Sequence, residues 1–338
     1  MRLSTALLAD TSVRLADLSF PHERVLLHRT RLAFIYLDKL LHFAKADRDG
    51  QVDAFIAVYL PTEVTLLVLN RGELATVISY TEGGRQVRSI PSALEHFKRE
   101  AERGEIVYCA APREQLAWMC GGCTTSATRR PLDAEHPERL LPDLMAEEFT
   151  GVLELVSNGR VNYLRFHEGV FRNGYFHEPL DELTVQQYVE RLFETNEDGA
   201  QPEVAAWVLP SVGELPEQSS PQLVQTYREA FWAIADAAEA EVPGKSKNRV
   251  ERIRDLQANV HQALKVIGAP REEDPPDLVT TPQELVFALS DWTLSLLEEV
   301  EVVAPGAAPK VLEQGTREHR FILQKAGFYD RLPWTVSW

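Results

Sequence analysis

The sequence has few cysteines and no long uncharged apolar run. Three cysteines in 338 residues are too few to hold domains of this size together with disulfides, which is typical of a reducing compartment. No uncharged apolar stretch reaches the roughly 20 residues that a membrane-spanning helix needs. Charged residues interrupt residues 1–18, unlike the continuous apolar core of a signal peptide. We therefore expect a cytoplasmic chain without a membrane span.

Positive charge is also scarce. The chain has 35 Lys and Arg residues against 51 Asp and Glu residues, a formal net charge of −16. Contact with nucleic-acid phosphates needs a basic surface, so this balance argues against nucleic acid as the main partner. The hydrophobic fraction of 44% is that of a folded protein. The length predicts two or three domains.

Familiar catalytic motifs are missing from the sequence. It contains no Walker loop, no Gly-x-Gly-x-x-Gly, no Gly-x-Ser-x-Gly and no His-Glu-x-x-His. These motifs carry nucleotide binding, nucleophilic hydrolysis and zinc proteolysis, so the sequence offers no reaction of these types. We expect a non-enzymatic protein without a cofactor.

An internal duplication organises the first 210 residues. Ala54–Gly72 aligns without a gap on Gly151–Gly169, at an offset of 97 residues. In the second copy, Asn158-Gly159 is a strong hairpin signal because both residues tolerate positive φ. Alternating apolar residues predict two hairpin strands and a third strand in each copy.

A later match extends the duplication to the end of each copy. Residues 105–112 match 203–210 at an offset of 98, which aligns Cys109 with Trp207 on a strand. Amphipathic spacing predicts one helix before each hairpin and another after the third strand. Each copy then reads helix, three-stranded meander, helix, strand, and a sheet covered by helices on one face can bury a core of its own. The predicted helices are 32–43 and 92–103 in the first copy, and 140–145 and 184–194 in the second.

The second copy resembles the PATAN-type domain of bacteria. The resemblance rests on Phe149-Thr-Gly-Val-Leu-Glu-Leu-Val, followed by Val161-Asn-Tyr-Leu-Arg-Phe-His-Glu-Gly-Val-Phe. The first copy departs from this pattern, because Asp53-Ala54 replaces the Thr-Gly and Leu69 replaces the aromatic residue. The resemblance covers roughly residues 31–210 and implies protein–protein contacts in bacterial signalling. The fold class we expect is α+β, with a first module at 1–130, a second at 131–215 and a helical bundle at 216–338.

The two modules differ in charge. Residues 1–130 carry 17 basic and 15 acidic residues, whereas residues 131–215 carry 5 and 17. An acidic surface can steer a basic protein partner, with a gain in association rate that falls as salt rises. The alternative is that the charge only keeps the surface hydrated. The candidate partner-binding residues are Glu147, Glu148, Glu178, Asp181 and Glu182.

The C-terminal third is predicted to be helical. Residues 211–221 are typical of a linker, and Ser220-Pro221 then caps and starts a helix. A second helix at about 246–267 is expected to bury Val250, Ile253, Leu256, Val260, Leu264 and Ile267. A capping box at residues 281–284 starts a third helix, and a fourth, near 309–326, is interrupted by Gly315. We expect the aromatic tail, residues 328–338, to pack back on this four-helix bundle rather than to dock on a partner.

Two local features leave alternatives open. Cys120-Gly-Gly-Cys123 has the spacing of a metal-binding pair or a redox dithiol, but small residues here also suit a connector between modules. His261 lies at the edge of the second helix's apolar stripe, and histidine phosphotransfer domains carry such a histidine on a bundle helix. The sequence thus favours a signalling adaptor that binds an unidentified protein partner, and self-association stays open. The alternatives are phosphotransfer through His261 and a zinc or thiol-redox protein using Cys120 and Cys123.

Overall fold

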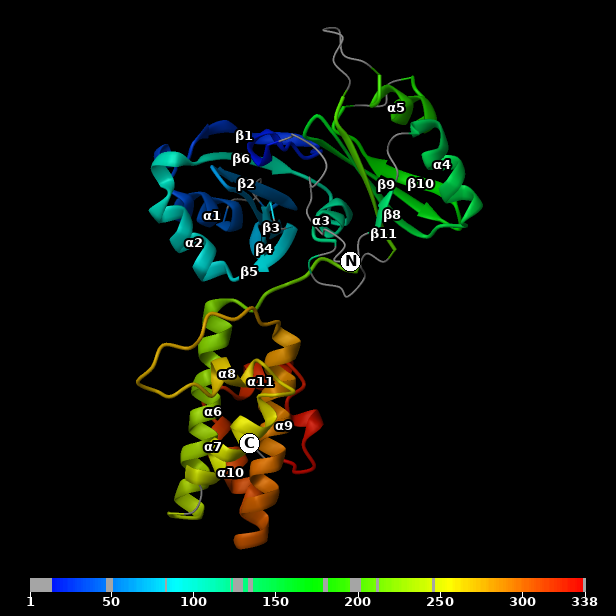
Figure 1. The fold of residues 1–338 in the computed structure, drawn as a ribbon. Helices are drawn as coiled ribbons and strands as arrows, with labels where there is room; N and C mark the ends of the chain where they lie inside the picture. Colours follow the sequence, from blue (N-terminus) through cyan, green and yellow to red (C-terminus); the bar gives the residue numbers. More distant parts are fainter. Residues whose placement is uncertain are drawn as a thin grey trace. The chain divides into compact units, whose positions relative to one another are not determined.

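The computed structural model describes residues 14–46, 51–82, 84–121, 123, 130–132, 136–178, 182–194, 202–210, 213–244 and 247–336. The chain divides into two compact units, Met1–Pro216 and Glu217–Trp338. The first unit contains two antiparallel sheets with helices and the second is helical (Figure 1), which makes the fold α+β.

The first sheet has six strands in the order β1-β6-β2-β3-β4-β5, and the second has five in the order β10-β9-β8-β11-β7. The first sheet comprises β1 (Arg24–Arg31), β2 (Ala54–Leu60), β3 (Glu63–Asn70), β4 (Glu73–Thr81), β5 (Gly84–Arg88) and β6 (Glu105–Ala110). The second comprises β7 (Arg130–Leu132), β8 (Gly151–Ser157), β9 (Arg160–His167), β10 (Val170–Tyr175) and β11 (Val204–Leu209). The helices are α1 (Leu37–Ala46) and α2 (Ile90–Arg99) beside the first sheet, α3 (Arg113–Met119) as connector, and α4 (Pro137–Ala146) and α5 (Val185–Arg191) beside the second.

The duplication is visible strand by strand. The order β1-β6-β2-β3-β4 of the first sheet matches the order β7-β11-β8-β9-β10 of the second. The β2–β3 and β8–β9 ladders have the same register at an offset of 97. A bulge falls at the same place in the next ladder of each copy, at Ala75 in β4 and at Arg172 in β10. Because a bulge re-aims the strand that carries it, both copies bend their third strand at the same point.

The last strand of each copy corrects our alignment. In the ladders Phe55 pairs with Cys109, and Val152 pairs with Leu209. The equivalent offset is therefore 100 rather than 98, and Cys109 corresponds to Leu209, not to Trp207. The error of two residues leaves the same side chains on the same face, since strand side chains repeat with a period of two.

Where the first copy departs from Thr-Gly, the same hydrogen bond is made by a different residue. In the second copy, the hydroxyl of Thr150 accepts a bond from the backbone N–H of Glu168 at 2.9 Å. In the first copy, the carboxylate of Asp53 accepts one from the N–H of Arg71 at 2.8 Å. Arg71 and Glu168 both have positive φ and precede a glycine with positive φ, so the side-chain oxygen stabilises the same turn in each copy.

Each sheet has a core of its own beneath its helices, and the two sheets also share a third core between them. Phe55 and Tyr59 of β2 point into the same apolar cluster as Val152 and Val156 of β8. The alternate residues of these strands face the helices, as Ile56 does toward α2. In Figure 1, α3 lies between the two sheets while α4 and α5 cover the opposite side of the second sheet. The expectation of one core per module was therefore incomplete, because the second face of each sheet is buried against the other.

The second unit is built around two long helices, α6 (Pro221–Glu241) and α9 (Pro282–Val303), which carry the predicted Ser220 cap and Thr281 capping box. Phe231 and Trp292 stack between them, with ring centroids 3.9 Å apart. The remaining helices are α7 (Lys247–Gln257), α8 (Leu264–Ile267), α10 (Ala308–Thr316) and α11 (Arg320–Lys325). Among the described residues, no helix is long and apolar enough to cross a membrane.

Two predicted helices are each broken in two. The helix expected at 246–267 ends at Gln257 and resumes at Leu264, and Leu256 and Val260 are 66% and 77% exposed rather than buried. The helix expected at 309–326 becomes α10 and α11. Gly315 lies inside α10, where a Cβ would come within 2.6 Å of the Cα of Ile234. Glycine is needed there because α10 packs directly on the backbone of α6.

The tail packs on the bundle through residue 336. Phe328 and Leu332 are buried, and Trp334 and Val336 pack against the same core. This confirms the expected packing of the aromatic tail over its described part; Trp338 lies outside the described residues.

Candidate functional site

A buried ion pair joins the two sheets. Arg85 on β5 donates to the carboxylate of Glu154 on β8, and the two side chains are 2% and 0% exposed. Arg85 also donates to the carbonyl oxygen of Gly121 at 3.3 Å and lies over the ring of Tyr80. Glu154 takes the ladder position that Ala57 has in the first copy, and in the described residues the second sheet has no strand equivalent to β5. The ion pair thus joins β5 to the position of β8 at which the first copy has Ala57, and the copies differ at both places.

A groove of about 930 Å³ opens between α3 and the second sheet. On its wall, Glu114 of α3 forms an ion pair with Arg165 and accepts hydrogen bonds from Asn173 at 3.0 Å and Tyr175 at 3.2 Å. These three donors, from β9 and β10, hold Glu114 and with it α3 against the second sheet. The charges of Glu114 and Arg165 largely offset each other, so the wall of the groove has little net charge at this point.

The N-terminal segment of the first module contacts the second. The backbone N–H of Ser19 donates to the carbonyl of Gly159 at 2.8 Å, and that of Val161 donates to Ser19 at 2.9 Å. The Ser19 hydroxyl lies 2.8 Å from Nε2 of His177. Burial lowers the pKa of His177, and the nearby charges of Arg160 and His22 lower it further. A neutral imidazole here hydrogen-bonds the segment to the sheet.

The helices α1 and α4 have the same length, and their bounds differ by 100 residues. Their inward residues correspond at this offset and pack on the sheets. The inward residues of α1 are Leu40, Leu41 and Ala44, and those of α4 are Leu140, Leu141 and Leu144.

The outward residues of the two helices differ in chemistry. On α4, Arg139 forms an ion pair with Asp143 at 3.7 Å. On α1, the equivalent residues are Lys39 and Phe43, and Phe43 is 51% exposed. The first module exposes two more aromatic residues nearby, Phe34 at 73% and Tyr36 at 76%. These residues did not emerge from the sequence, although the alignment of the two helices at 100 residues would have revealed the exchange of Phe43 for Asp143.

The acidic candidates of the second module differ in whether a basic side chain pairs with them. Glu147 pairs with Arg130 at 2.7 Å, and Glu178 pairs with Arg160. Glu148 and Glu182 are exposed, while Asp181 lies outside the described residues. Exposed ion pairs contribute little to stability, but pairing reduces the charge that Glu147 and Glu178 offer to a basic partner.

Cys120 and Cys123 lie at the connector beside the shared core. Neither forms a disulfide, and Cys120 is buried while Cys123 is half-buried. Burial raises the pKa of Cys120, and burial raises the pKa of Cys109 to about 12, so these two thiols are protonated at neutral pH. In the part of the chain that the structure describes, no group of three or more His, Cys, Asp or Glu side chains is placed to hold a metal ion.

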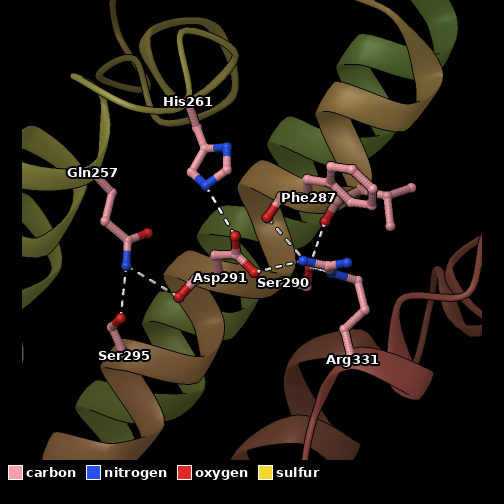
Figure 2. A network of polar contacts seen from close by, with 8 residues as sticks. Gln257, His261, Phe287, Ser290, Asp291, Ser295 and Arg331 are labelled. Carbon is pink, nitrogen blue, oxygen red and sulfur yellow. Dashed lines mark hydrogen bonds and ion pairs between the residues drawn. The ribbon is translucent and has the colours of Figure 1, made fainter.

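His261 lies in the turn between α7 and α8 and not on a helix. Its Nε2 is 2.9 Å from Oδ2 of Asp291 on α9, while Arg331 from the tail donates to Oδ1 at 3.0 Å. Figure 2 shows Asp291 between the side chains of His261 and Arg331, and Gln257 donates to the hydroxyl of Ser295 on the same helix at 2.6 Å. The carboxylate of Asp291 thus ties the α7–α8 turn and the tail to one helix. Phosphorylation of Nε2 would require this contact to open.

No family model, no curated protein and no solved structure matches the chain.

Proposed function

We propose that this chain is a non-enzymatic bacterial signalling adaptor that binds a protein partner through its two PATAN-like modules. The observation that carries the proposal is the comparison of α1 with α4. Both helices keep their inward leucines, but one exposes Lys39 with Phe43 where the other pairs Arg139 with Asp143. The second copy shows that this helix packs without an exposed aromatic residue there.

Exposed aromatic side chains favour recognition because an aromatic ring buries a large area at an interface. Contiguous exposed apolar surface on a folded protein is typical of an interaction site. The modules are joined by a shared core and a buried ion pair, so they would present their outer faces in a fixed relation. These features support an adaptor whose two copies have the same scaffold and different outer surfaces.

The test is recovery of a partner by the intact chain from its native host. We expect one protein in a stoichiometric amount, at physiological ionic strength and after a mild wash. If the second module steers a basic partner, association should slow as salt rises, and the variant Glu148→Gln, Glu182→Gln should show a weaker salt dependence. Absence of any stoichiometric protein, with the chain folded and in excess, would contradict the adaptor function.

A further inference from the structure

The outer surface at α1 combines aromatic and cationic groups. We call the set Arg31, Phe34, Tyr36, Lys39 and Phe43 the α1 face. All five side chains are exposed. Tyr36 directly precedes α1, and its carbonyl accepts the N–H of Leu40 in the first turn. Phe43 follows seven residues later, almost two helical turns and about 10 Å along the axis, which places it on the same side as Tyr36. Lys39 lies between them, with Nζ 5.0 Å from the centroid of the Tyr36 ring.

The cations of the α1 face have no acidic partner in the described part of the chain. The neighbouring lysines are neutralised, since Lys45 pairs with Glu73 at 3.1 Å and Lys98 pairs with Asp38 at 3.5 Å. No carboxylate is within ion-pair distance of Lys39 or Arg31 among the described residues.

The sequence around α1 is basic, whereas the chain as a whole is acidic. Residues 24–46 contain five Lys and Arg residues and one acidic residue, in a chain of net charge −16. In the second module the equivalent cation, Arg139, is neutralised by Asp143 at 3.7 Å. Replacement of that aspartate by Phe43 in the first module both exposes a ring and leaves the lysine charge available.

We propose that the α1 face binds an acidic segment of a protein partner in which carboxylates flank aromatic or aliphatic side chains. The apolar side chains would pack on Phe34, Tyr36 and Phe43, and the carboxylates would pair with Lys39 and Arg31 at the edge. A charged pair at the rim of an interface mainly selects the partner, whereas buried aromatic contacts supply most of the affinity. This inference rests on the proposed adaptor function and names the surface and the partner chemistry.

The experiment is a selection from a random dodecapeptide library displayed on phage, with the full-length chain as bait. We expect enriched peptides to hold Asp or Glu within four positions of Phe, Trp, Tyr or Leu. The most enriched peptide, synthesised with a fluorescent label, should bind Phe43→Asp about tenfold or more weakly, because loss of one well-packed aromatic contact costs at least that factor at a binding hot spot.

Matched variants separate the contributions of charge and packing. Lys39→Glu should also weaken binding of the peptide, and Lys39→Arg should retain it. Glu148→Gln, Glu182→Gln, on the second module, should bind the peptide as the unaltered chain does. The thermal unfolding of each variant is measured alongside; Phe43→Asp should stay folded because Asp143 is accommodated at the equivalent position of α4.

Three outcomes would overturn the proposal. Enrichment of basic peptides, or a selection that enriches no peptide, would show that the face does not select acidic segments. Equal affinity of the peptide for Phe43→Asp and the unaltered chain would place binding elsewhere. Cosedimentation with phosphatidylglycerol vesicles that is lost in Phe43→Asp would assign the face to a lipid surface.

The adaptor function and this inference can fail separately. A host partner recovered equally well by the unaltered chain and by Phe43→Asp would keep the adaptor function and reject the α1 face. Acidic peptides that bind the α1 face, in the absence of any stoichiometric host protein, would keep the face and reject the adaptor function.

Discussion

The first and second modules have one topology and two different surfaces. Their strand orders, hairpin registers, bulge positions and turn hydrogen bonds correspond. They differ at the outer helix, where the first module has Phe43 and the second has Asp143 at the equivalent position. They also differ at the junction between the modules, where the first has Ala57 and the second has Glu154. Because each copy is a reference for the other, the comparison separates residues that the fold requires from residues that can change without altering the fold. The leucines at 40 and 41 match those at 140 and 141 and pack inward, whereas Phe43 and Asp143 face solvent and Ala57 and Glu154 face the other module.

The largest expected effect lies at the junction between the modules. Arg85→Met or Glu154→Leu alone removes the ionic partner of a buried charge and should lower the free energy of unfolding by about 3–5 kcal/mol. The double variant removes both charges and should be far less destabilised than either single variant. Urea unfolding of all four proteins gives the comparison; additive losses in the double variant would mean that the two charges do not depend on each other.

At the matched turns of the two modules we expect a smaller loss of stability than at the junction, and the same loss in each turn. Thr150→Ala and Asp53→Ala each remove one hydrogen bond to the backbone N–H of a turn residue, and each should cost about 1 kcal/mol. Asp53→Thr places the hydroxyl of the second copy in the first and should restore most of the loss. Denaturant midpoints measure these differences. A large loss for one alanine variant and none for the other would break the equivalence of the two turns.

The pH dependence tests the contact between the N-terminal segment and the second module. Burial lowers the pKa of His177 in the folded state, so the unfolded chain takes up a proton before the folded chain does. Stability should therefore fall as the pH drops through the ordinary histidine pKa of about 6.5. His177→Gln should flatten this part of the profile of unfolding free energy against pH; an unchanged profile would contradict the account.

The smallest effect on stability is expected at the α1 face. Phe43→Asp converts an exposed position of α1 to the residue of α4 and should change the free energy of unfolding by no more than about 0.5 kcal/mol. Thermal and urea unfolding against the unaltered chain measure it. A loss as large as that of a core substitution would mean that Phe43 supports the fold, and the argument for binding would lose its basis.

Periodicity and turn chemistry were enough to predict the repeated hairpins. The Asn158-Gly159 turn and the alternation around it have a local physical cause, and so do the Ser220 cap and the capping box at Thr281. The α+β fold follows from these local signals.

The packing of one sheet on the other was not predicted, although a signal for it exists. Residues 54–60 and 63–69 are buried throughout, and a strand without polar alternation is typical of burial on both faces. Edge strand β1 was missed because Arg24–Arg31 shows no regular alternation, and its ladder has irregular register. The interruption of the second bundle helix has no glycine or proline to signal it.

The candidate site depends on contacts that sequence patterns do not encode. The sequence singled out Glu147 and Glu178 by charge, but whether an acid is available depends on its neighbours, and Arg130 and Arg160 pair with these two. It singled out His261 by its place on a predicted helix, and the helix ends before it. The sequence carries the exchange of Phe43 for Asp143 at an offset of 100 residues, but the exposure of Phe34, Tyr36 and Phe43 depends on how α1 packs on its sheet.

The most direct test places a photoreactive benzoylphenylalanine at one of two equivalent positions in the intact chain, in its native host. One protein has it in place of Phe43 on α1, and the other has it in place of Asp143 on α4. After irradiation, we predict that the first protein is joined to one partner by way of an acidic, apolar segment, and that the second is not. The same partner captured from position 143, or no partner captured from position 43, would contradict the account.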